Sequence, residues 1–167
     1  MGDATLREIL RGKRAHADPV ACVEDLPAAV AERQIEGYPH SISQIVSHMN
    51  YWMDYEIRRI EGRAVAYPEH AAEGWPASAA PVGKSAWQAT VRSFGDLLRK
   101  LESLADVEPE ILNRQVRGND AAQEAAVSSV YSVLWQTAAH NSYHVGQIAL
   151  LRRCLGAWPP RRGGDTW

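Results

Sequence analysis

The sequence predicts an all-α protein, a four-helix bundle with long connections and an irregular C-terminal tail. Three observations predict this class. Apolar residues recur at helical spacing in several long segments, and no sustained run alternates apolar with polar residues. Glycine and proline gather between the helical segments. With 167 residues, 46% of them hydrophobic, the chain has the length of one domain with its own core. We therefore expect residues 1–167 to form a single domain.

The N-terminal part of the chain predicts two helical segments. The first covers Thr5 to about His16, with apolar residues on one side. The second, residues 17–38, is a shorter helical piece that breaks at Pro27 and is followed by a loop. Proline breaks a helix because it lacks the backbone N–H that the helix interior needs.

The next predicted helix, residues 41–62, has clear boundary signals. Ser41 and Gln44 have the spacing of a capping box, in which each side chain accepts a hydrogen bond from the other residue's backbone N–H. Gly62 is of the residue type that commonly follows a helix. The apolar stripe between these signals consists of Ile45, Met49, Trp52, Met53, Ile57 and Ile60.

The C-terminal half predicts two more long helices. Residues 63–84 are rich in glycine and proline and form a predicted crossover loop. Ser85 and Gln88 repeat the capping-box spacing and predict a helix that continues to Leu104. A polar connection follows over residues 105–123, and the longest helix covers about Ser128 to Leu155.

The end of that last helix is also marked in the sequence. Gly156 suits the position just after a helix, and Pro159 prevents continuation. Arg152 and Arg153 lie in the final turn, where positive charge interacts favourably with the helix dipole. We expect an irregular tail that packs back through Trp158 or Trp167.

Composition and charge exclude several functional classes. The net charge is −2 with scattered basic residues, which argues against a nucleic-acid binder. No stretch approaches the roughly 20 apolar residues of a membrane helix, and the start lacks the apolar core of a signal peptide. Cys22 and Cys154 have no paired spacing, so they predict neither a disulfide framework nor a thiolate zinc site. A reduced, cytoplasmic protein is expected.

Three histidines predict a metal site between facing helices. His140 and His144 are four residues apart, so both imidazoles lie on one face of the last helix and can reach one ion. The segment reads HNSYH and lacks the glutamate of the zinc-protease motif, which argues against proteolysis. His48 supplies the third ligand, because it shares the apolar face of its own helix and needs a polar partner there.

Simpler interpretations of the histidines stay open at this point. A pair of histidines four residues apart is commonly a surface or structural feature, and His48 alone is commonly a hydrogen-bonded core residue. The other three histidines, His16, His40 and His70, lie near element ends or in loops, where we expect them to be solvated.

Two segments, LPAAVAERQIEGYPHSISQIVSHMNYW and HNSYHVGQIALLRRCLGAWPP, resemble the DinB/YfiT-like superfamily of small helical metalloproteins. The resemblance extends over nearly the whole chain. It implies that the family's three metal ligands are His48, His140 and His144, with none missing. It also implies an activity class, because relatives include thiol S-transferases that use low-molecular-weight thiols such as bacillithiol, and a mycothiol-dependent maleylpyruvate isomerase. Relatives are often homodimers, which makes a homodimer the expected assembly.

The chemistry expected of three imidazole ligands is that of an open metal centre. Three protein ligands leave coordination positions for water or substrate, as in catalytic sites, whereas structural sites have four. We expect one divalent transition metal, with zinc or nickel favoured and iron as an alternative. No catalytic residue is identified. Four residues one turn from the ligands are expected to line the pocket: Tyr51, Trp52, Gln136 and Thr137. Gly146 is expected to allow close approach of a neighbouring helix.

Two functional hypotheses from different classes follow. The first is a metal-dependent enzyme acting on a small molecule, a thiol transferase or a related detoxifying activity with a low-molecular-weight thiol as co-substrate. The second is a non-catalytic metal-binding stress or small-ligand-binding protein. An ion with an open, solvent-connected cavity would favour the enzyme, and an ion sealed by aromatic side chains would favour the second. Surplus aromatics such as Trp75, Trp135 and Trp158 are candidates for an interface or for the core.

Overall fold

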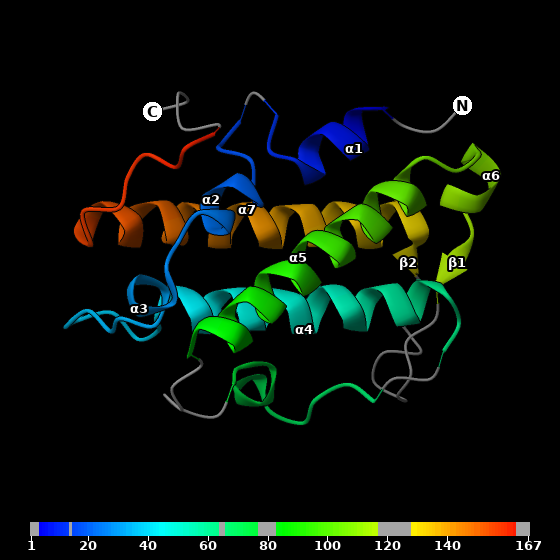
Figure 1. The fold of residues 1–167 in the computed structure, drawn as a ribbon. Coiled ribbons are helices and arrows are strands. Elements are labelled where there is room, and N and C mark those ends of the chain that lie inside the picture. The colour runs from blue at the N-terminus through cyan, green and yellow to red at the C-terminus, as the bar shows by residue number, and fades with distance from the viewer. Residues whose placement is uncertain (1–3, 14, 64–65, 77–82, 117–127, 163–167) are drawn as a thin grey trace.

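The computed structural model describes residues 4–13, 15–63, 66–76, 83–116 and 128–162, and most of these are helical (Figure 1). The prediction of an all-α protein is confirmed. The elements in chain order are α1 (Ala4–Leu10), α2 (Ala21–Glu24), α3 (Ala28–Ala31), α4 (Ile42–Ile60), the 3₁₀ helix η1 (Ala71–Gly74), α5 (Gly83–Ala105), α6 (Pro109–Leu112), β1 (Gln115–Val116), β2 (Ser128–Ser129) and α7 (Val130–Cys154).

Three long helices dominate the arrangement, with 19 residues in α4, 23 in α5 and 25 in α7. Figure 1 shows α4 and α7 side by side with opposite chain directions, and α5 crossing obliquely over them. The short helices α1 and α2 pack against α7, while α3 packs on α4 and α5. No described helix is long and apolar enough to cross a membrane.

The first helix is shorter than predicted. It ends at Leu10 and does not reach His16. Gly12 has a φ of 68°, a left-handed conformation that glycine adopts at little cost, and the His16 ring occupies the place where a Cβ at position 12 would lie. The chain therefore turns at Gly12. The sequence predicts four main helices. The structure has three long helices, and the remaining one, α1, has only seven residues.

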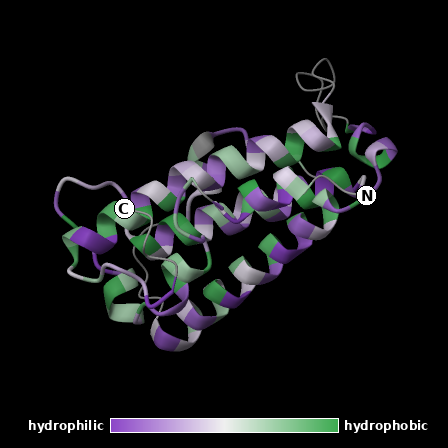
Figure 2. Cartoon of the chain, turned by 90° about the horizontal axis from the view of Figure 1, so that it is seen from above, coloured by the Kyte–Doolittle hydropathy of each residue, from purple (hydrophilic) through white to green (hydrophobic). Residues whose placement is uncertain are grey.

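Apolar side chains from all three long helices form one core cluster. Figure 2 shows apolar and polar residues interspersed along the long helices, and in α4 and α5 the apolar residues share one buried side. Helix α7 is the most enclosed, because α1, α2, α4, α5 and α6 all contact it. The largest completely buried side chains include Met49, Met53, Phe94, Leu98, Leu134 and Ile148. The two histidines of α7 are thus held on a central element.

The predicted boundary signals hold at α4 and fail at α5. The Ser41 N–H donates to Gln44 Oε1 over 2.8 Å, and the Gln44 N–H donates to Ser41 Oγ, which confirms the capping box. By contrast, α5 already begins at Gly83, so Ser85 lies inside its first turn and is no cap. The Gly83 N–H instead donates to the Glu32 carboxylate over 2.5 Å. A distant carboxylate thus satisfies the helix start, and local spacing does not reveal it.

The start of α7 also differs by two residues from the prediction. Ser128 and Ser129 pair antiparallel with Val116 and Gln115 in a two-stranded ribbon, and the helix begins at Val130. Strands of two residues are too short to give an alternating pattern, so the sequence did not predict them. Ser129 is the N-cap, with its Oγ accepting from the Ser132 N–H over 3.1 Å.

At the C-terminal end of α7, Arg152 and Arg153 have different surroundings. Arg152 is only 2% exposed, and its Nη1 donates to the Cys22 carbonyl over 2.7 Å and to Asp25 Oδ1 over 2.8 Å. It lies in the last turn as predicted and is in addition a buried ion-pair residue. Arg153 is exposed, with its guanidinium 4.0 Å from the centre of the Trp158 ring. Trp158 packs on the core as expected, and Trp167 lies outside the described residues.

Both cysteines are free thiols. Cys22 is buried, and this burial raises its pKa to about 11, which makes a thiolate there unfavourable at neutral pH. Cys154 is exposed.

Candidate metal centre

The three predicted ligands converge on one point. His48 comes from the middle of α4, and His140 and His144 come from successive turns of α7. One ring nitrogen from each lies within 4.8 Å of the other two. His140 Nε2 lies 3.2 Å from His48 Nε2 and 3.1 Å from His144 Nε2.

The outer ring nitrogens of two ligands are fixed by hydrogen bonds. His48 Nδ1 lies 2.8 Å from the Gly74 carbonyl oxygen, which can only accept, so Nδ1 carries the proton. His144 Nδ1 lies 2.6 Å from Gln147 Oε1, and the Gln147 amide nitrogen donates to the Tyr143 hydroxyl over 3.3 Å. Both Nε2 atoms are consequently unprotonated, and their lone pairs point toward His140.

This donor set fits a divalent transition metal. The Nε2 atoms of His48 and His144 are acceptors, and His140 Nε2 can supply at most one proton to them, whereas a cation between the three nitrogens would satisfy all three lone pairs. A tetrahedral zinc ion with Zn–N bonds of 2.0–2.1 Å separates its ligand nitrogens by about 3.3 Å, close to the distances found here. Histidine ligands that donate their second N–H to a carbonyl are also typical of metal sites.

Burial keeps all three imidazoles in the neutral form that a metal requires. It lowers the pKa of His48 to about 4, with a smaller lowering from the neighbouring His144 and an opposing effect of the Gly74 hydrogen bond. The pKa of His140 also falls to about 4, through burial and then through His144 and His48. Burial likewise lowers the pKa of His144. Protons therefore compete weakly with a metal at neutral pH.

The segment containing η1 forms one wall of the site. The Trp75 ring stacks on His48 with centroids 3.8 Å apart, and His40 stacks on Trp75 at 3.7 Å. At Gly74, an added Cβ would lie 2.8 Å from Trp52 Nε1, so only glycine permits this approach. Sequence reasoning missed Gly74 and left the position of Trp75 open, because the path of a long loop is set by tertiary contacts that local patterns do not reveal.

Two of the three remaining histidines are less solvated than expected. His40 is half-buried in the stack with Trp75. His16 is also half-buried, with Nδ1 2.8 Å from the Ala17 carbonyl oxygen and Nε2 2.8 Å from Ser142 Oγ, so it joins the N-terminal segment to α7. His70 is exposed, as predicted.

A family model described as the DinB superfamily matches residues 12–148, a region that contains all three histidines. The chain belongs to the DinB superfamily. Comparisons with curated proteins and with solved structures gave no match.

A cavity of about 410 Å³ opens beside the histidines of this DinB-superfamily protein, and His48 and His140 are part of its wall. Trp52, Gln136 and Thr137 line it, where the sequence placed them. Tyr51 does not line it, because consecutive helical residues point about 100° apart and Tyr51 lies on the other side of His48 from Trp52. Its side chain is 38% exposed and meets the Trp52 ring edge-on from outside.

An ion pair that the sequence analysis missed also lines this cavity. Arg59 Nε lies 3.1 Å from Glu56 Oε2, and the two side chains are only 12% and 14% exposed. A signal for both exists in the sequence, since positions 56 and 59 follow His48 at eight and eleven residues, on the same side of α4. Tyr67 and Trp75 complete the wall.

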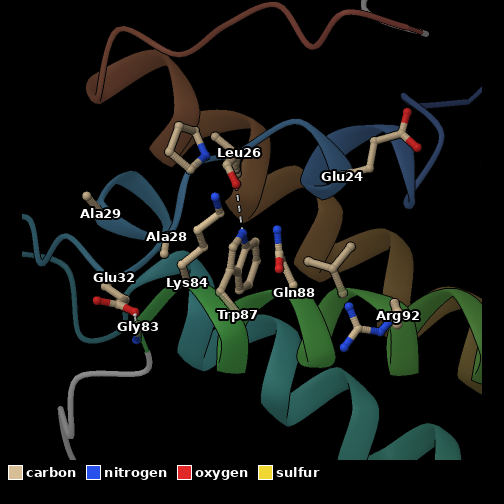
Figure 3. A pocket seen from close by; sticks show the side chains of 12 residues that line it. Glu24, Leu26, Ala28, Ala29, Glu32, Gly83, Lys84, Trp87, Gln88 and Arg92 are labelled. Atoms are coloured by element: carbon tan, nitrogen blue, oxygen red, sulfur yellow. Dashed lines mark hydrogen bonds between the residues drawn. The ribbon is translucent and has the colours of Figure 1, made fainter.

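A larger cavity, of about 860 Å³, lies between α3 and the start of α5 (Figure 3). Two of its polar groups have protein partners: the Trp87 indole N–H donates to the Leu26 carbonyl over 2.7 Å, and Glu32 accepts from the Gly83 N–H. Lys84 and Arg92 on its edge are exposed. It is lined by none of the predicted site residues, so size alone does not identify the functional cavity of this DinB-superfamily protein.

The predicted role of Gly146 is wrong. Gly146 is exposed, and a Cβ placed there would meet nothing within 4 Å, so it does not mediate close packing of a helix. Its neighbour Gln147 has a defined contact instead, the hydrogen bond to His144.

Proposed function

We propose that this DinB-superfamily protein is a metal-dependent transferase that acts on a small molecule with a low-molecular-weight thiol as co-substrate. The observation that carries the proposal is the cavity beside the histidines. His48 and His140 line a space of about 410 Å³, within the range of small-molecule sites. A metal held by three imidazoles would have its remaining positions accessible from this space, as in catalytic centres.

The chain's own residues would hold and orient the reacting groups. Nε2 atoms of His48, His140 and His144 supply the ligand set, and Gly74 and Gln147 fix two of the rings. When bound, a divalent cation would supply the positive charge that keeps a thiol ionised at neutral pH. Trp52 and Trp75 form apolar walls that reduce the access of water to the sulfur. In the transfer, the sulfur electron pair forms the new bond to an electrophilic carbon, whose leaving group departs with its bonding electrons, and the thiol proton goes to solvent.

The metal we propose is zinc or nickel, with iron as the alternative. All three accept imidazole ligands, and the neutral form of each histidine is favoured by burial.

Three further proposals concern the molecule as a whole. We propose a single domain with a four-helix-bundle architecture, in which the short α1 takes the fourth position; its contacts with α5 and α7 support this. We propose a cytoplasmic location, supported by two free thiols. We also propose a homodimer, for which the exposed Tyr131 and Trp135, one turn apart on α7, are the candidate contact residues. Light scattering on wild type and on Trp135→Asp tests the dimer, which the variant should weaken.

Metal analysis followed by a thiol-transfer screen tests the function. Protein purified without chelator should contain one transition-metal ion per chain. Metal-loaded protein should transfer a thiol to electrophilic substrates, and chelator-treated protein should not. His144→Ala should lose the metal and the activity while its circular dichroism stays helical. Equal transfer rates with and without metal would contradict the proposal, and stoichiometric metal without any transfer would favour the non-catalytic alternative.

A further inference from the structure

The Glu56–Arg59 ion pair lies at a defined position relative to the metal ligands. Arg59 follows His48 by eleven residues on α4, which places it about 16 Å further along the helix axis and within about 20° of the same direction. Trp52 and Glu56 lie between His48 and Arg59 on the same side of α4. Residues from both ends of this stripe line the one cavity of about 410 Å³.

The opposite wall of the cavity extends in the same direction. Helix α7 is antiparallel to α4 in Figure 1, so the path from His140 to Thr137 and Gln136 follows the path from His48 toward Arg59. The cavity is therefore elongated, with imidazoles at one end and a guanidinium at the other. Aromatic rings of Trp52, Tyr67 and Trp75 lie on its walls.

The Arg59 guanidinium has donors to spare. Its Nε lies 3.1 Å from Glu56 Oε2 in an ion pair that lacks the alignment of a hydrogen bond, and no described residue accepts a hydrogen bond from its two terminal nitrogens. A guanidinium presents five N–H groups, and the pair of terminal nitrogens matches the two oxygens of a carboxylate. Glu56 attracts the guanidinium electrostatically, and burial raises the pKa of Glu56 while Arg59 opposes that rise. A side chain that is 12% exposed and lines a cavity is well suited to such recognition.

We propose that Arg59, oriented by Glu56, binds a carboxylate of the small molecule whose other end meets the three-histidine centre. The substrate class is thus an elongated, carboxylate-bearing thiol. This inference rests on the proposed function for the identity of the metal-binding end. Arg59 is a binding residue in it, and Glu56 is a positioning residue.

Binding of simple thiols to cobalt-loaded protein tests the inference, because a thiolate bound to Co²⁺ gives a charge-transfer absorption band. The probes are ω-mercaptocarboxylates from mercaptopropionate to mercaptooctanoate, each compared with the mercaptoalcohol of equal length. We expect the acid of suitable length to bind wild-type protein about tenfold or more tightly than its alcohol. We expect the shortest acid, which cannot reach Arg59 from the metal, to show no such preference.

Matched variants assign the preference to Arg59. Arg59→Gln should bind acid and alcohol equally, while the exposed Arg58→Gln, which removes the same charge one residue away, should keep the wild-type preference. Glu56→Gln keeps the Arg59 charge but removes the charge that orients it, so the preference should fall and yet stay above that of Arg59→Gln. If Arg59→Gln disturbs the fold by leaving Glu56 unpaired, the double variant Glu56→Gln/Arg59→Gln removes both charges and should bind acid and alcohol equally.

The outcomes separate this inference from the proposed function. No charge-transfer band with any thiol would contradict the thiol-binding centre itself. A band with every thiol but equal affinities for acid and alcohol in wild type would overturn the role of Arg59 alone. Equal losses of preference in Arg58→Gln and Arg59→Gln would also overturn it, because they would indicate general surface electrostatics.

Discussion

At the residue scale, the hydrogen bonds of the Nδ1 atoms of His48 and His144 determine whether their Nε2 atoms can bind a metal. Gly74 and Gln147 accept from the Nδ1 atoms of His48 and His144, so each Nε2 is left as a ligand atom. Neither acceptor touches the metal position. Both nevertheless determine whether the three lone pairs meet at one point.

Replacement of Gln147 tests this indirect role. Gln147→Ala removes the acceptor for His144 Nδ1, and we expect zinc affinity to fall about 10- to 100-fold. Gln147→Glu retains an oxygen acceptor for His144 Nδ1 and should bind zinc clearly more tightly than Gln147→Ala does. Competition with a chromophoric chelator measures both affinities. Equal affinity of wild type and Gln147→Ala would show that the hydrogen bond does not orient the ligand.

The histidine pKa values predict how the stability of the metal-free protein depends on pH. His48 and His140 have an ordinary pKa of 6.5 when unfolded and a pKa of about 4 in the folded chain. Between these values the unfolded state binds more protons than the folded state, so the free energy of unfolding falls as pH falls from about 6.5 to about 4. Urea unfolding of chelator-treated protein across this window measures the slope. His48→Gln should reduce the slope, because it removes one of the two groups whose pKa is lowered to about 4.

At the element scale, the segment containing η1 is held against α4 by one close approach. Gly74→Ala would place a methyl group 2.8 Å from Trp52 Nε1, within a rigid ring that cannot move aside cheaply. The loop must shift, and the Gly74 carbonyl then moves away from His48. We expect zinc affinity to fall about tenfold or more, measured by chelator competition.

Gly146→Ala is the matched control for that variant. It changes glycine to alanine on the ligand-bearing helix α7, at an exposed site with nothing within 4 Å. Its zinc affinity should equal that of wild type, and its stability should rise by about 0.5–1 kcal/mol through higher helix propensity. A loss of affinity as large as that of Gly74→Ala would contradict the steric explanation.

The elements also differ in how far the sequence could predict them. The stripe of α4 and the four-residue spacing of His140 and His144 are local patterns, so the convergence of the three histidines and the helices that carry them were predictable. Glu32 caps α5 from 51 positions away, and the carbonyl that fixes His48 comes from a loop 26 positions on. Such contacts are fixed only when distant segments pack, which is why the start of α5 and the wall of the site were not predicted.

At the scale of the whole molecule, Arg152 joins three segments that are distant in sequence. Its guanidinium bonds to Cys22 and Asp25 near α2 and to the Ala157 carbonyl beyond α7. Asp25 also accepts the Arg161 N–H over 2.9 Å. Partial burial raises the pKa of Asp25, but the hydrogen bonds from Arg152 and from the Arg161 N–H outweigh this effect and keep the pKa below its usual value.

Arg152→Met should therefore destabilise the protein strongly. The variant leaves Asp25 without its buried partner, a change that costs about 3–5 kcal/mol in comparable ion pairs. Arg153→Met removes a neighbouring exposed charge that stacks on Trp158 and donates a long hydrogen bond to the Ala149 carbonyl, and it should cost no more than about 1 kcal/mol. Urea unfolding measures both. Similar losses in the two variants would refute the role assigned to the buried pair.

The three histidines bring residue 48 of α4 next to residues 140 and 144 of α7, so a metal bound by all three would couple its binding to folding. An ion that binds only the folded chain stabilises it by about 2.7 kcal/mol when free metal is 100 times its dissociation constant. Preparations of identical sequence that differ in metal content should melt at different temperatures. In a cell, the lifetime of this chain would then report on the supply of its metal, because starvation would enlarge the unfolded population that proteases remove.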